Sequence, residues 1–405
     1  MASRICIVGA GHAGGLVAAQ LAKRAPAARI TLVGAEPHLP YQRPPLSKAY
    51  LAGDLARERL YLRPPAFYEK AGIALILGVA ARAIDRSAKT VRLDDGRDLG
   101  YDKLALATGG AARRLAVPGA DLPGVHYLRD IADADALRRR LCQGARLVVI
   151  GGGYVGLEVA AMARKLGLEV TLVELAGRLL ARVAPPVISD FLARLHREEG
   201  VAVYLGAMVS ALEGKGRVTA VALDDGRHLP ADLVVVGVGL SPNTALAEAA
   251  GLACEDGILV DEYAVTSDPA IVALGDCANA FNLFLGRRAR LESVQNATDM
   301  APVAAASLAG APQPLAAVPW FWSEQYDVKL QSVGLAQGFD QMVLRGDPFK
   351  GRGFAAFYLK EGRVIAADCV NRMQAFMAAK RLAGEGRPVD AACLGDDAFD
   401  LKQLF

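Results

Sequence analysis

The chain has 405 residues, of which 53% are hydrophobic and 22% charged, and its formal net charge is +3. At roughly 150 residues per domain this length predicts two to three domains, with ample apolar residues for large buried cores. The mild charge argues against a basic nucleic-acid-binding tail, and no apolar run reaches the roughly 18 residues that cross a bilayer.

The first part of the chain has a strand–turn–helix–strand pattern. Residues 4–8 predict a buried strand, residues 9–14 (GAGHAG) a Gly-rich turn, an Ala-rich helix follows to about residue 24, and residues 29–33 predict a second strand that ends near Glu36. In such a turn the first glycine makes the bend, the second lets the backbone approach a pyrophosphate, and the third packs the helix against the strand. The acid after the second strand accepts hydrogen bonds from ribose hydroxyls, so we predict a dinucleotide site here.

The same pattern returns in the middle of the chain. Residues 146–150 predict a strand, residues 151–156 (GGGYVG) a second Gly-rich turn, and a helix follows to about residue 166. A strand at residues 169–173 then ends at Glu174. Because both units have the strands, the helix and the acid that the motif requires, we predict two dinucleotide sites in one chain.

Shorter signals lie between and after these units. Residues 103–108 (KLALAT) and 233–238 predict buried strands that run into Gly turns, and residues 271–274 predict a strand that leads to Asp276, an acid placed to touch a bound ligand. The last 85 or so residues differ in character. An aromatic cluster around Trp322 and the segments 354–360 and 364–367 predict an antiparallel sheet in a further domain.

The six cysteines are widely scattered, and no two have the C-x-x-C spacing of a redox dithiol or half a metal site. The five histidines, including His12, form no spaced set with carboxylates, so we predict no metal site. No charged region followed by an apolar stretch, as in a secretory signal, precedes the first strand. We therefore expect a cytoplasmic protein with reduced thiols, and neither a membrane nor a nucleic acid as partner.

Several motifs resemble those of a known superfamily. The two Gly-rich units, residues 107–110 (ATGG) and residues 275–278 (GDCA) are similar to the two-dinucleotide flavoproteins related to glutathione reductase. Further segments resemble the putidaredoxin reductase-like ferredoxin reductases of bacterial oxygenase systems, which serve cytochromes P450. These segments are residues 43–48 (RPPLSK), 127–129 (YLR), 292–297 (ESVQNA) and 319–323 (PWFWS). The similarity covers nearly the whole chain.

The resemblance implies an α/β fold with two Rossmann-like dinucleotide-binding domains of the glutathione-reductase type and a C-terminal α+β interface domain. In that family the FAD-binding domain is split, and the NAD-binding domain is inserted into it. The expected FAD domain covers residues 1–111 and 241–318, the NAD domain residues 112–240, and the interface domain residues 319–405.

The resemblance also implies site residues. Lys48 and Val294 are expected at the flavin ring, Asp276 at the ribityl chain, and Arg129 and the backbone of Ala81 at the adenosine half. The complete implied FAD set is Gly9, Gly11, Ala13, Gly14, Glu36, Arg43, Lys48, Ala81, Thr108, Gly109, Arg129, Asp276, Val294 and Trp322. The implied NAD set is Gly151, Gly153, Tyr154, Gly156, Glu158 and Glu174.

Four of these residues have two possible roles each. Glu158 lies on a helix that is otherwise Leu, Val and Ala, where an unpaired charge is costly. Lys48 is its natural partner, and because related enzymes pair the two beside the flavin we predict a catalytic pair; the alternatives are a solvated Lys48 and an exposed Glu158. Tyr154 is expected to cover the flavin until nicotinamide displaces it, or else only to pack the Gly turn. Trp322 is expected near the flavin on the acceptor side, or else in the core of the C-terminal domain.

The implied function is that of an NADH-dependent ferredoxin reductase. Hydride passes from NADH to non-covalently bound FAD, and electrons leave singly to an acidic [2Fe–2S] ferredoxin that docks near the flavin edge and feeds a cytochrome P450 or other oxygenase. Disulfide-using members have cysteines where this chain has residues 43–48, so no dithiol relay is expected. Glu174 favours NADH because it repels a 2′-phosphate, and Arg178 is a weaker opposite signal.

Three other functions fit the same scaffold. They are reduction of oxygen or a quinone, as in NADH oxidase or peroxidase relatives; reduction of rubredoxin or of the ascorbyl radical; and redox-sensed partner binding, as in apoptosis-inducing-factor-like flavoproteins. The missing cysteine argues against the first, and the lack of an added insert or a basic DNA-binding tract argues against the third. The sequence predicts no particular oligomeric state.

Overall fold

The computed structural model describes residues 2–405, which form two compact units. The first unit comprises the residues up to Arg43 together with Arg57–Ala111 and Ser241–Ala317. The second comprises Pro44–Ala56, Ala112–Leu240 and Val318–Phe405. Strands β8 (Gly110–Ala112) and β17 (Leu240–Pro242) include residues at which the chain passes from one unit to the other. No helix among residues 2–405 is long and apolar enough to cross a membrane.

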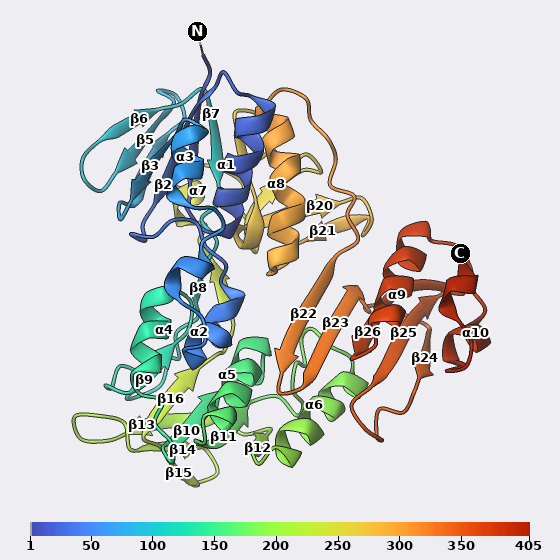
Figure 1. Ribbon diagram of the computed structural model, residues 1–405. Coiled ribbons are helices and arrows are strands. Elements are labelled where there is room, and N and C mark those ends of the chain that lie inside the picture. Colours follow the sequence, from blue (N-terminus) through green and yellow to red (C-terminus); the bar gives the residue numbers. More distant parts are fainter. Residues whose placement is uncertain (1) are drawn as a thin grey trace. The chain divides into compact units, whose positions relative to one another are not determined.

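The first unit is built on a parallel sheet of five strands in the order β19-β7-β1-β2-β3. The strands are β1 (Arg4–Val8), β2 (Arg29–Gly34), β3 (Ile73–Leu77), β7 (Lys103–Leu106) and β19 (Ile271–Ala273). Helices α1 (His12–Arg24) and α8 (Val294–Leu308) pack side by side in this unit (Figure 1). Four of the five residues of β1 are buried, as the apolar run at residues 4–8 predicts for a parallel strand.

The remaining elements of the first unit are small. They are η2 (Arg57–Leu60), α3 (Pro65–Lys70), β4 (Ala81–Asp85), β5 (Thr90–Leu93), β6 (Asp98–Gly100), α7 (Ala245–Ala249), β18 (Ile258–Val260), η3 (Gly275–Cys277), β20 (Ala278–Asn282) and β21 (Arg287–Ala289). Strands β4, β5 and β6 form an antiparallel sheet, and β18, β20 and β21 a second small sheet.

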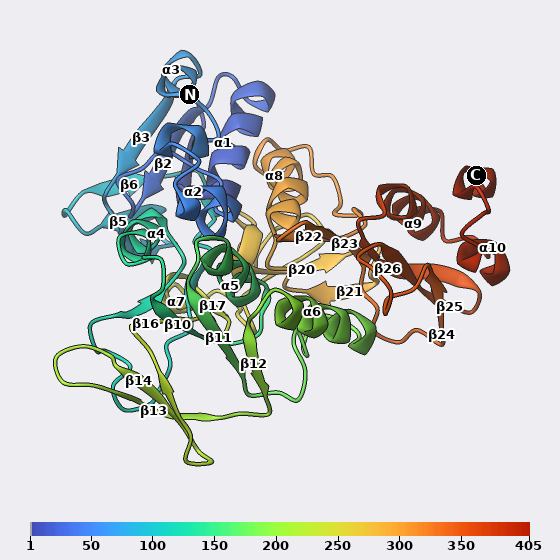
Figure 2. The ribbon, with the colours of Figure 1, turned by 60° about the horizontal axis from the view of Figure 1, so that its bottom comes forward.

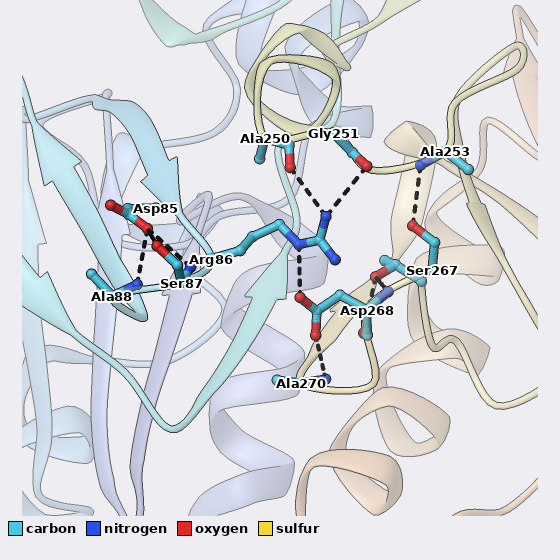
Figure 3. Close-up of polar contacts among 11 residues, drawn as sticks. Asp85, Arg86, Ser87, Ala88, Ala250, Gly251, Ala253, Ser267, Asp268 and Ala270 are labelled. Carbon is cyan, nitrogen blue, oxygen red and sulfur yellow. Dashed lines mark hydrogen bonds and ion pairs between the residues drawn. The ribbon is translucent and has the colours of Figure 1, made fainter.

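An arginine fixes the β4–β6 sheet to two distant loops of the same unit (Figure 3). Arg86 donates from Nε to the carboxylate of Asp268 at 2.7 Å and from Nη1 to the carbonyls of Ala250 and Gly251 at 3.4 Å. Asp268 also accepts from the backbone N–H of Ala270. Burial opposes ionisation of Asp268, but these hydrogen bonds outweigh it and lower the pKa of the carboxyl. Arg86 therefore stabilises the packing of the β4–β6 sheet against the loops that contain Asp268 and Ala250.

The second unit contains the second parallel sheet, in the order β12-β11-β10-β16-β9. Its strands are β9 (Val125–Tyr127), β10 (Arg146–Ile150), β11 (Glu169–Glu174), β12 (Ala202–Leu205) and β16 (Leu233–Val236). The helices and the small sheet beside it are α4 (Ile131–Arg138), α5 (Tyr154–Lys165), α6 (Pro186–Glu198), β13 (Val209–Glu213), β14 (Ala220–Leu223) and β15 (His228–Pro230). Both predicted strand–turn–helix–strand units are confirmed, and the two predicted strands that lead to Gly turns end two residues early, because the turn has already begun there.

The last part of the chain forms the antiparallel sheet that the sequence predicts, in the order β22-β23-β26-β25-β24, with α9 packed on it (Figure 2). Its elements are β22 (Trp320–Gln325), β23 (Val328–Gly334), β24 (Gln341–Arg345), β25 (Phe354–Lys360), β26 (Arg363–Val370), α9 (Met373–Glu385), α10 (Ala391–Gly395) and η4 (Leu401–Leu404). Phe354 and Val370 of this sheet lie in one hydrophobic core with Leu157 of α5 and Phe191 of α6.

The short segment Pro44–Ala56 belongs to the second unit, although the sequence predicts residues 1–111 as one part of the FAD domain. It contains η1 (Pro44–Ser47) and α2 (Ala49–Ala52). Leu51 lies in the core of the second unit, and the Tyr50 hydroxyl donates to Asp135 of α4 at 2.7 Å. These contacts explain why the segment clusters with residues far from it in sequence. The three predicted domain boundaries themselves stay predictions.

Candidate functional site

The first Gly-rich turn has the shape of a pyrophosphate cradle. Gly9 has a φ of +108°, and a Cβ there would lie 2.1 Å from the carbonyl oxygen of Ala107. A Cβ at Gly14 would lie 1.8 Å from the carbonyl oxygen of Gly9, so neither position admits a side chain. At Gly11, in contrast, no atom lies within 4 Å of the Cβ position. The turn is closed at its first and third glycines and open at its second, as close approach of a pyrophosphate requires.

The N-terminus of α1 is open to an anion. Its N-cap, Gly11, provides no side-chain cap, and the first turn contains no acidic residue, so backbone N–H groups are left for a phosphate. His12 has a buried Nδ1 atom without a hydrogen-bond partner among the described residues. Burial lowers the pKa of His12, the negative charge of Asp276 raises it, and the positive charge of Arg43 lowers it further. The structure therefore brings Asp276 and Arg43, two predicted FAD residues, into the electrostatic surroundings of this turn.

The first acid is held by side chains that the sequence analysis missed in part. Glu36, two residues beyond the end of β2, pairs with Arg43 at 2.7 Å and accepts from the Tyr41 hydroxyl at 2.6 Å. Tyr41 was not predicted, and its only signal was its place between two other candidate residues. Because Glu36 and Arg43 are both in the implied FAD set, their ion pair places one predicted ribose acid beside a predicted cation.

The turn after β7 is held by hydrogen bonds to Asn243, a residue that the sequence analysis did not identify. Thr108 donates from Oγ1 to the carbonyl of Asn243 at 2.8 Å, and Asn243 donates from its amide nitrogen to the carbonyl of Thr108 at 2.9 Å. The backbone N–H of Asn243 also donates to the carbonyl of Gly109. No signal in the sequence indicated that Asn243 would contact the turn after β7.

The remaining predicted FAD residues of the first unit lie at or near the first residue of a helix or strand. Ala13 is buried, and its Cβ lies 3.0 Å from the Cβ position of Gly275, so α1 contacts the turn that contains Asp276. Ala81 is the first residue of β4, and Val294 the first of α8, whose N-cap Ser293 accepts from the N–H of Asn296. Three members of the implied FAD set, Lys48, Arg129 and Trp322, lie in the second unit.

The second Gly-rich turn repeats the first. Gly151 has a φ of +106°, and its Cβ position is 2.4 Å from the carbonyl oxygen of Gly237. The Cβ position of Gly156 is 2.2 Å from the carbonyl oxygen of Gly151, whereas that of Gly153 has no atom closer than 3.8 Å. The N-terminus of α5 likewise has no side-chain cap. The second unit thus has a second cradle, which has no room for a side chain at Gly151 and Gly156 but is open at Gly153.

The acid of the second cradle is held by the backbone. Glu174 accepts from the N–H of Gly152 at 2.6 Å and from the N–H of Ala176 at 2.7 Å. Arg178, the opposing signal, donates from its guanidinium to the carbonyls of Ala181 and Ala184 and to the Ser189 hydroxyl. The arginine is therefore occupied by its own loop.

The predicted ion pair between Lys48 and Glu158 is present in the second unit. Lys48 Nζ lies 2.6 Å from Glu158 Oε2, and the Glu158 side chain is only 6% exposed. Ser47 donates to the same oxygen at 2.6 Å, and Ser323 of β22 donates to Oε1 at 2.7 Å. The exposed alternative for Glu158 is wrong, since the side chain is buried, and three donors compensate its charge. The role of the pair beside a flavin stays a prediction.

The aromatic candidates lie near one another on α5 and β22. The ring of Tyr154, the first residue of α5, packs 4.4 Å from the ring of Phe321, and burial raises the pKa of its hydroxyl. Trp322 is half-buried, with its ring 5.6 Å from that of Trp320. Lys380 of α9 lies 5.2 Å over the Trp320 ring, which adds a cation to the cluster.

Comparison with known proteins identifies the class. Residues 3–301 match the model of the pyridine nucleotide-disulphide oxidoreductase family, and residues 320–405 match a reductase C-terminal domain. The chain belongs to the pyridine nucleotide-disulphide oxidoreductases, a family of oxidoreductases that use FAD and NAD(H).

Within that family the chain is similar to ferredoxin reductases. It is 47% identical to a ferredoxin–NAD(P)(+) reductase of Sphingomonas sp. over 403 residues, which cover 99% of this chain and 97% of that protein. It is 45% identical to the putidaredoxin reductase of Pseudomonas putida over 406 residues, covering 99% and 96%. The solved covalent complex of putidaredoxin reductase with putidaredoxin matches with a TM-score of 0.96 and 45% identity, covering 99% of this chain and 98% of that one. The resemblance inferred from the sequence is confirmed.

Proposed function

We propose that the chain is an NADH-dependent ferredoxin reductase, which delivers electrons to an acidic [2Fe–2S] ferredoxin that serves a cytochrome P450 or another oxygenase. The observation on which the proposal depends is the presence of two cradles in one chain, each closed at its first and third glycines and open at its second. Two such turns fit two dinucleotides. Similarity to ferredoxin reductases over nearly the whole chain supports the choice of acceptor.

Different residues would bind the two dinucleotides and fix the position of the Lys48 ammonium group. FAD, when bound, supplies the redox chemistry, since a flavin takes up two electrons as hydride and releases them singly. The N–H groups at the start of α1 would hold its pyrophosphate, and those at the start of α5 would hold that of NADH. Lys48 provides a positive charge whose position Glu158 fixes at 2.6 Å. Because residues 43–48 include no cysteine, this chain has no thiol at the place where disulfide-using relatives have theirs.

NADH rather than NADPH is the proposed donor. Glu174 already bridges the Gly-rich turn and the N–H of Ala176, so its carboxylate is fixed at the end of β11 and would repel a 2′-phosphate. The guanidinium of Arg178 donates to backbone carbonyls of its own loop, which removes the cation that an NADPH site needs.

An acidic acceptor fits the aromatic cluster of the second unit. Lys380 stacks on Trp320, whose ring lies beside that of Trp322, so a positive charge accompanies the proposed exit for electrons. We place the protein in the cytoplasm, where its six free cysteines would stay reduced.

The proposal is tested by measuring cytochrome c reduction by NADH with and without an added [2Fe–2S] ferredoxin. We expect the rate to depend on ferredoxin, and to fall between 0.01 M and 0.15 M ionic strength as the Debye length shrinks from roughly 30 Å to about 8 Å. Reduction of the enzyme's flavin by NADH should change little over the same range and serves as the control. Equal rates with and without ferredoxin, or faster turnover with rubredoxin or oxygen, would contradict the proposal.

A further inference from the structure

A chain of buried polar side chains ends at Glu158. The Ser323 hydroxyl donates to Glu158 Oε1 at 2.7 Å, and Gln325 donates from Nε2 to Ser323 Oγ at 3.1 Å. His196 Nε2 lies 2.8 Å from Gln325 Oε1, and the Tyr326 hydroxyl lies 3.1 Å from His196 Nδ1. Ser323, Gln325 and His196 are 1%, 2% and 0% exposed, so bulk solvent does not reach them.

The chemistry of the groups fixes the direction of every hydrogen bond. An amide oxygen only accepts, so His196 Nε2 must donate to Gln325. The neutral ring then accepts at Nδ1, and Tyr326 donates to it. All the hydrogens from Tyr326 onward therefore point toward the carboxylate of Glu158. Hydrogen bonds aligned in this way polarise one another inside a protein, which strengthens the last one.

The register of β22 places two members of the chain on one face. Ser323 and Gln325 are two residues apart on the strand, so both side chains leave it on the same side. His196 comes from α6, and Tyr326, with a φ of +57°, lies between β22 and β23. The three donors of Glu158 thus come from two places: Ser47 and Lys48 bind Oε2, and Ser323 alone binds Oε1.

We propose that Ser323, Gln325 and His196 are positioning residues that fix the Glu158 carboxylate and, through it, the ammonium group of Lys48. Without the Ser323 donor, Oε1 becomes a buried acceptor with no partner, and the carboxylate gains freedom to rotate away from Lys48. The consequence for flavin reduction rests on the proposed function, whereas the effect on Lys48 does not.

The chain transmits geometry and polarity rather than protons. The amide of Gln325 interrupts any proton path, because it does not exchange a proton between its oxygen and its nitrogen as a hydroxyl or imidazole does. Burial lowers the pKa of His196 to about 4, against smaller opposing effects of Gln325 and Glu199, so the ring stays neutral near pH 7.

Acylation of Lys48, followed by mass spectrometry of the purified holoprotein, tests the proposal without any turnover. The Lys48 side chain is 17% exposed and paired, so it should react slowly. Ser323→Ala should raise its acylation rate roughly tenfold, about the effect of one charge-assisted hydrogen bond. Ser323→Thr keeps the hydroxyl and should restore the slow rate. Ser307→Ala, which removes a serine that donates to the Tyr263 carbonyl in the first unit, is the matched control and should react as the wild type does.

A second variant tests the direction of the chain. Gln325→Glu has the same shape but cannot donate to Ser323, and it adds a negative charge near Glu158. It should free Lys48 at least as much as Ser323→Ala does. In anaerobic stopped-flow traces, both variants should lower the limiting rate of flavin reduction while the Kd for NADH changes little. Neither should slow the reaction further in a Glu158→Gln background, since both act through Glu158.

Unchanged Lys48 acylation in both Ser323→Ala and Gln325→Glu would overturn the proposal, and so would an equal rise in Ser323→Thr. If the wild-type flavin is not reduced by NADH but the acylation pattern is as expected, the proposed function fails and the positioning chain stands. If NADH reduces the wild-type flavin but Lys48 acylation is the same in all variants, the proposed function stands and the positioning chain fails.

Discussion

The two Gly-rich turns share one backbone geometry, but the helices after them differ at matching positions. Gly9 and Gly151 have φ values of +108° and +106°, and their Cβ positions lie within 2.4 Å of a carbonyl oxygen in the neighbouring turn. Two residues beyond the third glycine, however, the first helix has Leu16, which packs on the core, and the second has Glu158, paired with Lys48. The shape of each turn depends on its glycines and backbone, whereas the ion pair with Lys48 depends on one side chain of the second helix, Glu158.

The acids of the two cradles differ as well. Glu36 is bound by the side chains of Arg43 and Tyr41, while Glu174 is bound by the backbone N–H groups of Gly152 and Ala176. A backbone contact persists when nearby side chains change. The carboxylate of Glu174 is therefore held more rigidly than that of Glu36.

The largest expected effect comes from closing the first cradle with Gly9→Ala. The added Cβ would lie 2.1 Å from the Ala107 carbonyl oxygen at a φ of +108°, so the turn must move. A penalty of about 3 kcal/mol would weaken FAD binding about a hundredfold. The ratio of FAD to protein after gel filtration measures this. Gly144→Ala, at a φ of +78° with no atom within 4 Å, is the control and should keep its FAD.

Glu158→Leu gives the second helix the same residue that the first helix has at this position, Leu16. We expect a free-energy cost nearly as large as that of Gly9→Ala. The substitution leaves Lys48 and two hydroxyls without their acceptor, and removal of one partner of a buried pair costs about 3 kcal/mol of unfolding free energy. We also expect flavin reduction by NADH to slow at least about tenfold while FAD stays bound. Denaturant titration and stopped-flow traces measure the two effects. Leu16→Met, a volume-conserving change at the matching position, should cost less than about 1.5 kcal/mol; a similar loss in both variants would remove the contrast.

The polar chain of the second unit predicts a pH dependence of stability. The folded-state pKa of His196 is about 4, below the ordinary 6.5, so the unfolded chain binds more protons between these values and stability falls as pH falls. Between pH 6.5 and pH 5 this contributes about 2 kcal/mol. Urea titrations at several pH values should show a shallower dependence of the unfolding free energy on pH for His196→Gln than for the wild type. Burial lowers the pKa of His12 and His126 too, so part of the slope should persist.

The smallest effect is expected from the second acid. Glu174→Ser removes the carboxylate from the end of β11 and should narrow the preference for NADH over NADPH by about tenfold, or about 1.4 kcal/mol. The ratio of kcat/KM for the two coenzymes is the measurement. Glu169→Ser, at the exposed start of the same strand, should leave the ratio unchanged. An unaltered ratio in Glu174→Ser would show that another residue selects the coenzyme.

The sequence was enough for features whose partners are near in the chain or dictated by a motif. Periodicity and glycine spacing predicted both parallel units. The cost of a lone buried charge indicated that Glu158 needs a partner, and the resemblance to related enzymes pointed to Lys48. The strand at residues 233–238 was predicted too long, because its last two apolar residues belong to the turn that packs against Gly151.

Apart from the Lys48–Glu158 pair, contacts between polar residues far apart in the chain were not predicted. Ser323 reaches Glu158 from 165 residues away, and Asn243 reaches Thr108 from 135. Neither residue stands out in the sequence, since a serine in a strand and an asparagine in a turn are ordinary. Only the register of β22 and the fold of the turn make them partners. The same holds for Pro44–Ala56, whose membership of the second unit follows from contacts with α4 and α5.

The central claim is that each cradle has its own dinucleotide, and anaerobic mixing of Gly151→Ala with NADH tests it most directly. The added Cβ would lie 2.4 Å from the Gly237 carbonyl oxygen, while the first unit is untouched. We predict a variant that keeps its FAD and is bleached by dithionite as the wild type is, yet is reduced by NADH at least about a hundredfold more slowly. Bleaching by NADH at the wild-type rate, or loss of FAD along with NADH reactivity, would contradict the account.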